Sequence, residues 1–247
     1  MNDIGNKTLA QIVTGNYKAA SLFEKYNLDF CCKGKRSLQQ ACEEQKLPLE
    51  EILLELSVVN NAINGSQKFS FHKISLSQLV DYILTKHHDY VKKELPQLFR
   101  YLQKVVSKHS NRHPELLKVF ELFAAIKEEM EGHMQKEELI LFPRIKELEK
   151  FAQQQPPGEF KLNLSYLLSP ITIMQQEHDH AGSMMEEIRL LTNTYTPPND
   201  ACTTYRLSFT ALQAFESDLH RHVHLENNIL FPGAIELYRK LHVSILN

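Results

Sequence analysis

The sequence contains no tryptophan and only eight glycines in 247 residues, which fits a helix-rich chain better than a β-sandwich. It has no run of about 18 apolar residues, so no transmembrane helix and no membrane partner are predicted. The first residues lack the basic and then long apolar profile of a signal peptide. A basic excess is also missing, because the formal net charge is -2, and this argues against a nucleic-acid partner.

Cysteine is scarce as well. The chain has four cysteines, of which Cys31 and Cys32 are adjacent, and this is not the pattern of a secreted disulfide framework. We therefore predict a reducing, cytoplasmic environment. Histidine, in contrast, is abundant for this length, with 12 residues, and histidine is a common metal ligand.

The chain divides into two predicted domains and belongs to the all-α class. In residues 1–65, apolar side chains recur at helical spacing around "DFCCKGKRSL", which predicts a small N-terminal helical domain with a Cys-Cys motif. The polar stretch "NNAINGSQKFS" then indicates a linker. Residues 71–247 contain four long amphipathic stretches, which predict a C-terminal antiparallel four-helix bundle. A loop containing "QQQPPG" separates its two halves.

Prolines predict where the bundle helices begin, bend or end. Pro96 is expected to bend the first helix, and Ser169 followed by Pro170 is expected to start the third. In each of two "LFP" segments, Pro143 and Pro232 are expected to end or bend the helix.

The two halves of the bundle repeat each other. "HMQKEELILFP" begins at His133 and "HVHLENNILFP" begins at His222, 89 positions later. His88 and His178 each precede an aspartate and lie 90 positions apart. The preserved feature of this duplicated hairpin is a set of polar residues, whereas a purely structural repeat would preserve apolar positions first.

In H-x-x-x-E, the histidine and the glutamate project from one face of a helix. Two buried glutamates facing each other are costly unless cations lie between them. Two metal ions satisfy this requirement if each takes two histidines and if both glutamates bridge the pair. The predicted ligands are His88, His133, Glu137, His178, His222 and Glu226.

Histidine and carboxylate without thiolate suit iron or manganese, with zinc as an alternative. An oxo or hydroxo bridge would make each ion five-coordinate and leave a position open for nitric oxide or dioxygen. A ferritin-like site is rejected because it needs two E-x-x-H motifs. Glu177 and His180 have that spacing, but Met130 precedes His133 and Leu219 precedes His222.

Competing interpretations remain. One isolated H-x-x-x-E carries little information, and a decayed bundle or an exposed histidine array could also contain these residues. His224 lies two positions after His222 and is expected to point away from its face. His87, His180 and His220 flank the predicted ligands and either support them or are exposed.

These motifs resemble those of the Repair of Iron Centres family, the ScdA/YtfE type of di-iron protein. The resemblance covers nearly the whole chain and rests on "LFEKYNLDFCCKGKRSL", "HHDYVKKELPQL", "HMQKEELILFP", "EHDHAG" and "HVHLENNILFP". The resemblance implies that residues 71–247 form a hemerythrin-like di-iron four-helix bundle, and the family's ligand pattern falls on the same six residues. The spacing to "ELP" places it on His88 rather than His87.

The resemblance implies a cytoplasmic protein that repairs iron-sulfur clusters after nitrosative or oxidative stress. It would donate iron to damaged iron-sulfur proteins, with Cys31 and Cys32 as the relay. Two alternatives remain: an enzyme with nitric oxide reductase activity, and a hemerythrin-like binder or sensor of dioxygen or nitric oxide. Simple dioxygen carriage is disfavoured because hemerythrin has five histidine ligands and only four are found here.

The N-terminal motif departs from the family, which has Cys-Cys-Gly-Gly where this chain has Lys33 and Gly34 after the cysteines. Lys33 should favour a thiolate at Cys31 or Cys32 if either thiol is exposed. The competing interpretation is that both cysteines are buried for packing. Because a unit of about 60 residues has a marginal core alone, the N-terminal domain is expected to form a homodimer or to dock on its own bundle.

Overall fold

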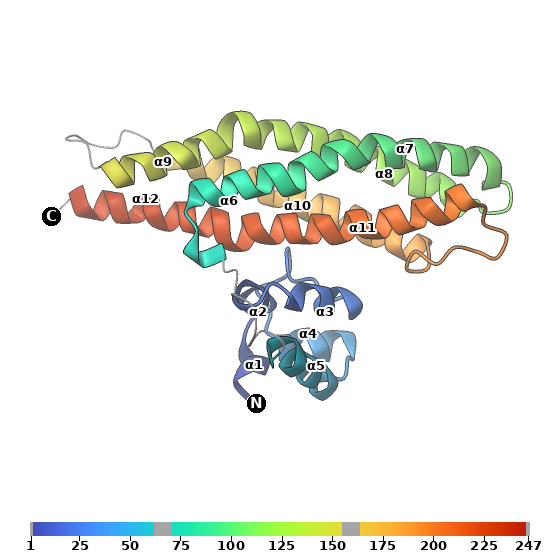
Figure 1. Cartoon of the computed structure of the whole chain (residues 1–247), viewed down its shortest axis with the longest axis horizontal. Coiled ribbons are helices and arrows are strands. Elements are labelled where there is room, and N and C mark those ends of the chain that lie inside the picture. Colours follow the sequence, from blue (N-terminus) through green and yellow to red (C-terminus); the bar gives the residue numbers. More distant parts are fainter. Residues whose placement is uncertain (1, 62–70, 155–163, 246–247) are drawn as a thin grey trace.

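The computed structural model describes residues 2–61, 71–154 and 164–245, and in these ranges the chain is built from helices (Figure 1). Among these residues the only β contact is an isolated bridge between Thr8 and Ser37. The predicted all-α class is therefore confirmed. The predicted linker, from residue 62 onward, and most of the loop between the halves, at 155–163, lie outside the described residues.

Five short helices form the N-terminal unit. They are α1 (Asn2–Asn6), α2 (Leu9–Gly15), α3 (Ala19–Lys25), α4 (Leu38–Gln45) and α5 (Leu49–Asn61). Capping boxes start two of them, because Thr8 pairs with Gln11 before α2 and Ser37 pairs with Gln40 before α4. The long segment between α3 and α4 carries the two adjacent cysteines.

The bundle begins after a short 3-10 turn, η1 (Phe71–Lys73). Three of its four long helices contain a π-helical turn, so these three are described in segments. The first comprises α6 (Leu76–Ile83), η2 (Leu84–His88) and α7 (Asp89–His109); the second α8 (Glu115–Lys136), η3 (Glu137–Leu141) and α9 (Phe142–Gln154); the third α10 (Ser165–Leu191); and the fourth α11 (Thr203–Leu225), η4 (Glu226–Leu230) and α12 (Phe231–Ile245). Helix α8 packs against α7 and α10, and α11 packs against α7 and α10. No described helix is long and apolar enough to cross a membrane.

Two hydrophobic clusters fill the bundle. One contains Val91, Met134 and Ala181 and continues into the N-terminal unit, whereas the other contains Ile83, Leu141 and other side chains from the opposite end of the bundle. On each of the four helices, the predicted ligand positions lie between residues of the two clusters. The polar residues therefore form one layer across the middle of the bundle, closed by apolar side chains on both sides.

The predicted start of the third helix at Ser169 is wrong, because α10 begins at Ser165 and contains Pro170. Proline has no N–H to donate to the carbonyl four residues earlier, which belongs to Tyr166. Arg144 supplies the missing donor, since its Nη1 donates to the Tyr166 carbonyl oxygen at 2.7 Å. A partner on the neighbouring helix thus allows the proline inside the helix.

Pro143 and Pro232 do not end their helices, which continue as α9 and α12. Each proline follows a π-helical turn, in which the N–H groups bond five residues back. The Phe142 N–H bonds to the Glu137 carbonyl, and the corresponding N–H of Phe231 bonds to Glu226. Each proline therefore stands directly after the shifted bond, at the point where the helix returns to regular bonding, and the helix continues past it.

The N-terminal unit packs against the side of the bundle near α11 (Figure 1). The contact is partly polar: Thr14 Oγ1 lies 3.3 Å from His224 Nε2, and Asn228 Nδ2 donates to the Cys31 carbonyl at 3.2 Å. Phe30 adds an edge contact to the His224 ring, with the centroids 5.6 Å apart. The structure therefore shows docking on the same chain's bundle, one of the two expected arrangements.

We predict that Glu149→Ala lowers the free energy of unfolding by about 1–3 kcal/mol. The Glu149 carboxylate is buried and accepts hydrogen bonds from the N–H groups of Leu76 and Ser77, at 2.7 and 2.9 Å, at the start of α6. Urea denaturation of the metal-free chain measures the loss. Glu147→Ala is the matched control, because Glu147 is exposed on the same helix. Equal stability of the two variants would contradict this role.

Candidate metal centre

π-helical turns position three of the six predicted ligands. His88 is the last residue of η2, and Glu137 and Glu226 are the first residues of η3 and η4. A π-helical turn widens a helix locally and is often found at functional sites. In both copies, "ILFP" covers the end of the π-helical turn that begins with the glutamate and the proline that follows. The repeated motif and the glutamate are therefore parts of one local structure.

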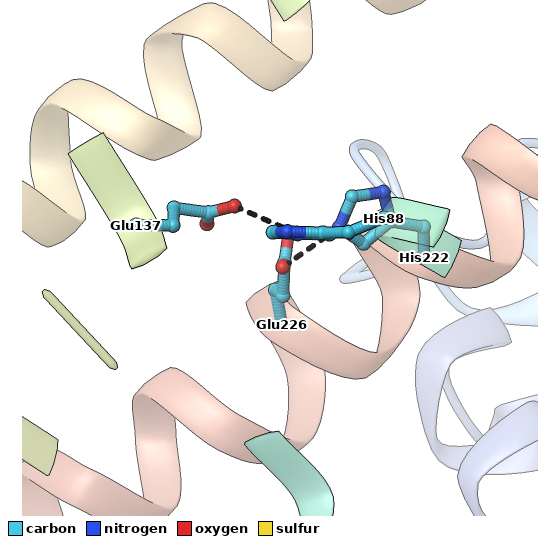
Figure 2. A group of neighbouring side chains, drawn as sticks. All are labelled: His88, Glu137, His222 and Glu226. Atoms are coloured by element: carbon cyan, nitrogen blue, oxygen red, sulfur yellow. Dashed lines mark hydrogen bonds and ion pairs between the residues drawn. The ribbon is translucent and has the colours of Figure 1, made fainter. Parts of the chain in front are cut away.

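The six residues form two groups of four donors. His88 and His222 form one group with both glutamates, and His133 and His178 form the other with the same two glutamates. Within each group the candidate ligand atoms lie within 4.8 Å of one another. Figure 2 shows the first group, in which Glu137 reaches toward the other three side chains from a separate helix. Sharing both carboxylates is the arrangement expected for two cations bridged by glutamates.

The imidazole nitrogens face the carboxylates. His222 Nε2 lies 2.9 Å from Glu226 Oε1, and His178 Nε2 lies 3.1 Å from Glu226 Oε2. His88 Nε2 and His133 Nε2 each lie 3.3 Å from Glu137 Oε2. The His133 and His178 Nε2 atoms are themselves 3.0 Å apart. Lone pairs from four rings and two carboxylates thus converge on one small volume.

Burial shows that these residues fit metal ions. Each of the six residues is at most 1% exposed. Both Glu137 oxygens, Glu226 Oε2 and His88 Nε2 are buried and make no hydrogen bond to a described residue. Buried carboxylates without such partners are costly, and bound cations would satisfy them. The donor set is nitrogen and oxygen without sulfur, which suits iron.

The electrostatics of the metal-free site favour charged carboxylates beside protonated rings at His88 and His133, whereas burial lowers the pKa of His222. Burial raises the pKa of Glu226, but His222 and His178 lower it more, leaving it well below the usual range. Burial likewise opposes the charged form of His133, yet the Glu137 carboxylate raises its pKa to about 9. In the absence of metal, protons therefore take the place of cations in this layer.

A second set of side chains orients the ligands. His88 Nδ1 lies 2.7 Å from Glu138 Oε1, and Lys92 Nζ donates to the same carboxylate at 2.7 Å. His133 Nδ1 lies 2.9 Å from Glu177 Oε2, and Lys136 pairs with that carboxylate. Each ring can thus donate its outer N–H while Nε2 stays unprotonated for a metal. The same chain of contacts, from histidine to glutamate to lysine, thus occurs twice, once behind His88 and once behind His133.

The other two ligand rings are supported differently. His178 Nδ1 lies 3.0 Å from Asn227 Oδ1, on the π-helical turn that begins with Glu226. His222 Nδ1 is buried without a hydrogen bond to a described residue, and the ring stacks on that of His87 at 5.5 Å. His87 is itself buried and lies 3.0 Å from Asp218 Oδ1.

The structure brings all six sequence-predicted ligands together, and their roles as ligands remain a prediction for metal analysis. Among the flanking histidines, His87 is buried against the site, whereas His180 is largely exposed and pairs with Glu129 at 2.9 Å. Sequence reasoning missed the supporting set. Three of its members, Glu138, Glu177 and Asn227, are adjacent to predicted ligands in the chain, and this adjacency was the available signal. The missed residues are Glu138, Glu177, Asp218 and Asn227.

The two cysteines lie where the N-terminal unit meets the bundle. Cys31 is buried and Cys32 is half-buried, and their Sγ atoms are 3.8 Å apart. Asp29 Oδ1 accepts hydrogen bonds from both backbone N–H groups, at 3.1 and 2.9 Å, and from the Cys31 thiol at 3.2 Å. A Cβ added to Gly182 on α10 would lie 3.7 Å from Cys32 Sγ. The loop is thus held by its own aspartate and faces α10.

The expected thiolate at Cys31 is not supported. The neighbouring Cys32 thiol, burial and the Asp29 charge together raise the pKa of Cys31 well above its usual value. The departure from Cys-Cys-Gly-Gly has a simple steric reason. A Cβ on Gly34 would lie 2.2 Å from the Phe30 carbonyl oxygen, so the second glycine is required, whereas the first position holds Lys33, which is exposed.

Comparisons with known proteins agree with both parts of this structure. The family model described as the hemerythrin HHE cation binding domain matches residues 79–234, and the ScdA_N model, described as a domain of unknown function, matches residues 5–60. Iron-sulfur cluster repair protein YtfE of Shigella boydii is 34% identical over 230 residues, covering 93% of this chain and 97% of the relative. The protein of that name from Cronobacter sakazakii is 36% identical over 218 residues, covering 88% and 91%.

We predict that Glu226→Gln lowers iron affinity by at least about tenfold, because the neutral amide removes a charge from both donor groups. Metal analysis after anaerobic loading and dialysis measures the iron retained per chain. The matched control is Glu131→Gln, on an exposed residue of α8. A Glu226→Gln chain that retains as much iron as the control would contradict the bridging role.

Iron affinity should also depend on pH. A ligand histidine must lose its proton, and the pKa of His133 in the metal-free chain is about 9. The protonated form competes with iron below this value, so affinity is expected to rise with pH toward 9 and to fall by up to about tenfold per pH unit below it. Competition with a chelator at two pH values measures this slope. His133→Gln should flatten it and His180→Gln should not; equal slopes in both variants would refute the assignment.

Proposed function

Because the chain belongs to the hemerythrin HHE cation-binding family and to the family of YtfE iron-sulfur cluster repair proteins, we propose that it restores damaged iron-sulfur clusters in other proteins. The observation that carries the proposal is the pair of buried donor groups that share Glu137 and Glu226. Its supporting observation is the pair of adjacent thiols where the N-terminal unit meets the bundle.

Two iron ions are the proposed contents of the layer. His88 and His222 would hold one ion, His133 and His178 the other, and the two glutamates would bridge them, together with the predicted oxo or hydroxo bridge. Bound iron supplies both a deliverable ion and a redox-active centre. The lysine-paired glutamates behind His88 and His133 keep these rings oriented, so the apolar bundle can hold charged donors without letting them turn away.

The two cysteines are the proposed relay for iron on its way to a client protein. One π-helical turn links them to the metal layer, because η4 provides Glu226 to the layer and Asn228 to the Cys31 carbonyl. Cys32, the more exposed thiol, is the group that a client would meet. Cys31, whose thiol donates to Asp29, would become a thiolate when a cation replaces its proton.

Small ligands are a further part of the proposal. Two histidines and two shared carboxylates leave positions open on an ion with an octahedral preference, and nitric oxide or dioxygen would fit there. A nitric oxide reductase activity or a sensing role would use the same positions. The Cys-Cys unit docked beside the bundle favours repair over these two alternatives, since neither needs a thiol pair.

The clients are proposed to be cytoplasmic proteins whose iron-sulfur clusters have been damaged by nitrosative or oxidative stress. A homodimer also stays a proposal. Docking on its own bundle already gives the N-terminal unit a shared hydrophobic core, so a dimer would have to use another surface. Light scattering at several protein concentrations measures the oligomeric state.

We predict that replacing both Cys31 and Cys32 by serine slows cluster restoration at least about tenfold while leaving the bundle iron content unchanged, because serine is a poor ligand for iron in transit. Recovery of activity by a nitrosylated iron-sulfur enzyme measures repair, and metal analysis measures iron. Cys202→Ser, at an exposed cysteine of the bundle, is the control. Normal restoration by the double variant would exclude the relay role.

A further inference from the structure

A large cleft lies between the N-terminal unit and the bundle. Its volume is about 870 Å³, and its walls come from the cysteine loop and α3 on one side and from α10 and α11 on the other. None of the six proposed iron ligands lines it. The cleft is therefore separate from the metal layer. The two thiols line the cleft, and the contact between Asn228 of η4 and the Cys31 carbonyl connects their loop to the layer.

The thiol end of the cleft is an incomplete metal site. Asp29, Cys31 and Cys32 offer three ligand atoms within 4.8 Å of one another, and no fourth histidine, cysteine or acidic residue among the described parts of the chain joins them. Iron held by thiolates takes four ligands. A fourth ligand therefore has to come from a molecule in the cleft, and a soft thiolate is the donor that matches the other two sulfurs.

Another part of the cleft wall holds two buried polar groups. Tyr195 is 6% exposed, and burial together with the neighbouring Glu216 carboxylate raises the pKa of its hydroxyl. A left-handed turn carries it, with φ of 47°, 55° and 59° at residues 193–195, a conformation uncommon outside glycine. Glu216 is also 6% exposed, and Arg189 Nη1 donates to it at 3.2 Å. One wall of the cleft thus presents the Tyr195 hydroxyl and the Glu216 carboxylate to a ligand.

Charges of both signs line the remaining walls. Lys33 and Arg36 extend from the cysteine loop, and Glu24 and Glu186 face the cleft from α3 and α10. Glu24 Oε1 is buried without a hydrogen bond to a described residue. Such a lining suits a ligand that carries an ammonium and a carboxylate together, and it suits neither a bare anion nor a bare cation.

We propose that the cleft binds a small zwitterionic thiol, an amino acid or short peptide whose sulfur lies beside Cys32 and whose charged groups meet the Tyr195 and Glu216 wall and the basic loop. The inference rests on the proposed function, because the bound thiol would complete the ligand set around iron that passes through Asp29, Cys31 and Cys32. It forms no covalent bond to the chain.

Anaerobic calorimetry with glutathione as the probe tests this on the full, iron-loaded chain. Saturable binding is expected at glutathione concentrations up to about 10 mM, and one further equivalent of Fe(II) should tighten it at least about tenfold because metal joins the two thiol partners. S-methylglutathione keeps the charges but is a poor ligand, so Fe(II) should not tighten its binding. An equal gain for the methylated peptide would overturn the sulfur contact.

Tyr195→Phe should weaken glutathione binding about fivefold by removing one hydrogen-bonding group, whereas Tyr101→Phe, on α7 away from the cleft, should not. Failure of the wild-type chain to bind glutathione, while repair still depends on Cys31 and Cys32, overturns this inference alone. Normal repair by the Cys31→Ser, Cys32→Ser chain overturns the proposed function, and this inference falls with it.

Discussion

The burial of two facing carboxylates is the constraint on which the rest of this structure depends. Glu137 and Glu226 are fully buried, come from different helices and each face two imidazoles. Without a cation between them, their charges would be stabilised only by protonated rings, which include a His133 whose pKa reaches about 9. Two bound cations would remove this conflict at once. The apolar clusters on both sides then become an advantage, because they hold the layer closed to water.

The π-helical turns connect this layer to the N-terminal unit. The turn η4 places Glu226 in the layer, Asn227 against His178, and Asn228 against the Cys31 carbonyl within three consecutive residues. A single turn of backbone therefore contacts both the metal layer and the cysteine loop. The other half of the bundle builds the same kind of turn after Glu137. The two copies thus provide equivalent glutamates, and the copy after Glu226 also contacts the cysteine loop.

Much of this could be predicted from sequence, for identifiable physical reasons. The spacing in H-x-x-x-E fixes two side chains on one helical face, so His133 and Glu137 could be placed together from the sequence alone. The repeat then supplied the remaining ligands. Contacts between helices could not be predicted from the sequence. The Arg144 donor that allows Pro170 inside α10 belongs to another helix. So does the Glu177 that supports His133. A thiolate was expected at Cys31 or Cys32 only for an exposed thiol, and Cys31 is buried, so Cys32, burial and Asp29 raise its pKa instead.

Anomalous diffraction at the iron edge, from crystals of the iron-loaded chain, would show directly whether paired cations lie between the buried glutamates. Two peaks are expected in the middle of the bundle, one within bonding distance of His88 and His222 and the other of His133 and His178. Both peaks should contact Glu137 and Glu226. A single peak, or two peaks that do not share these carboxylates, would contradict the conclusion that paired cations stabilise the buried glutamates.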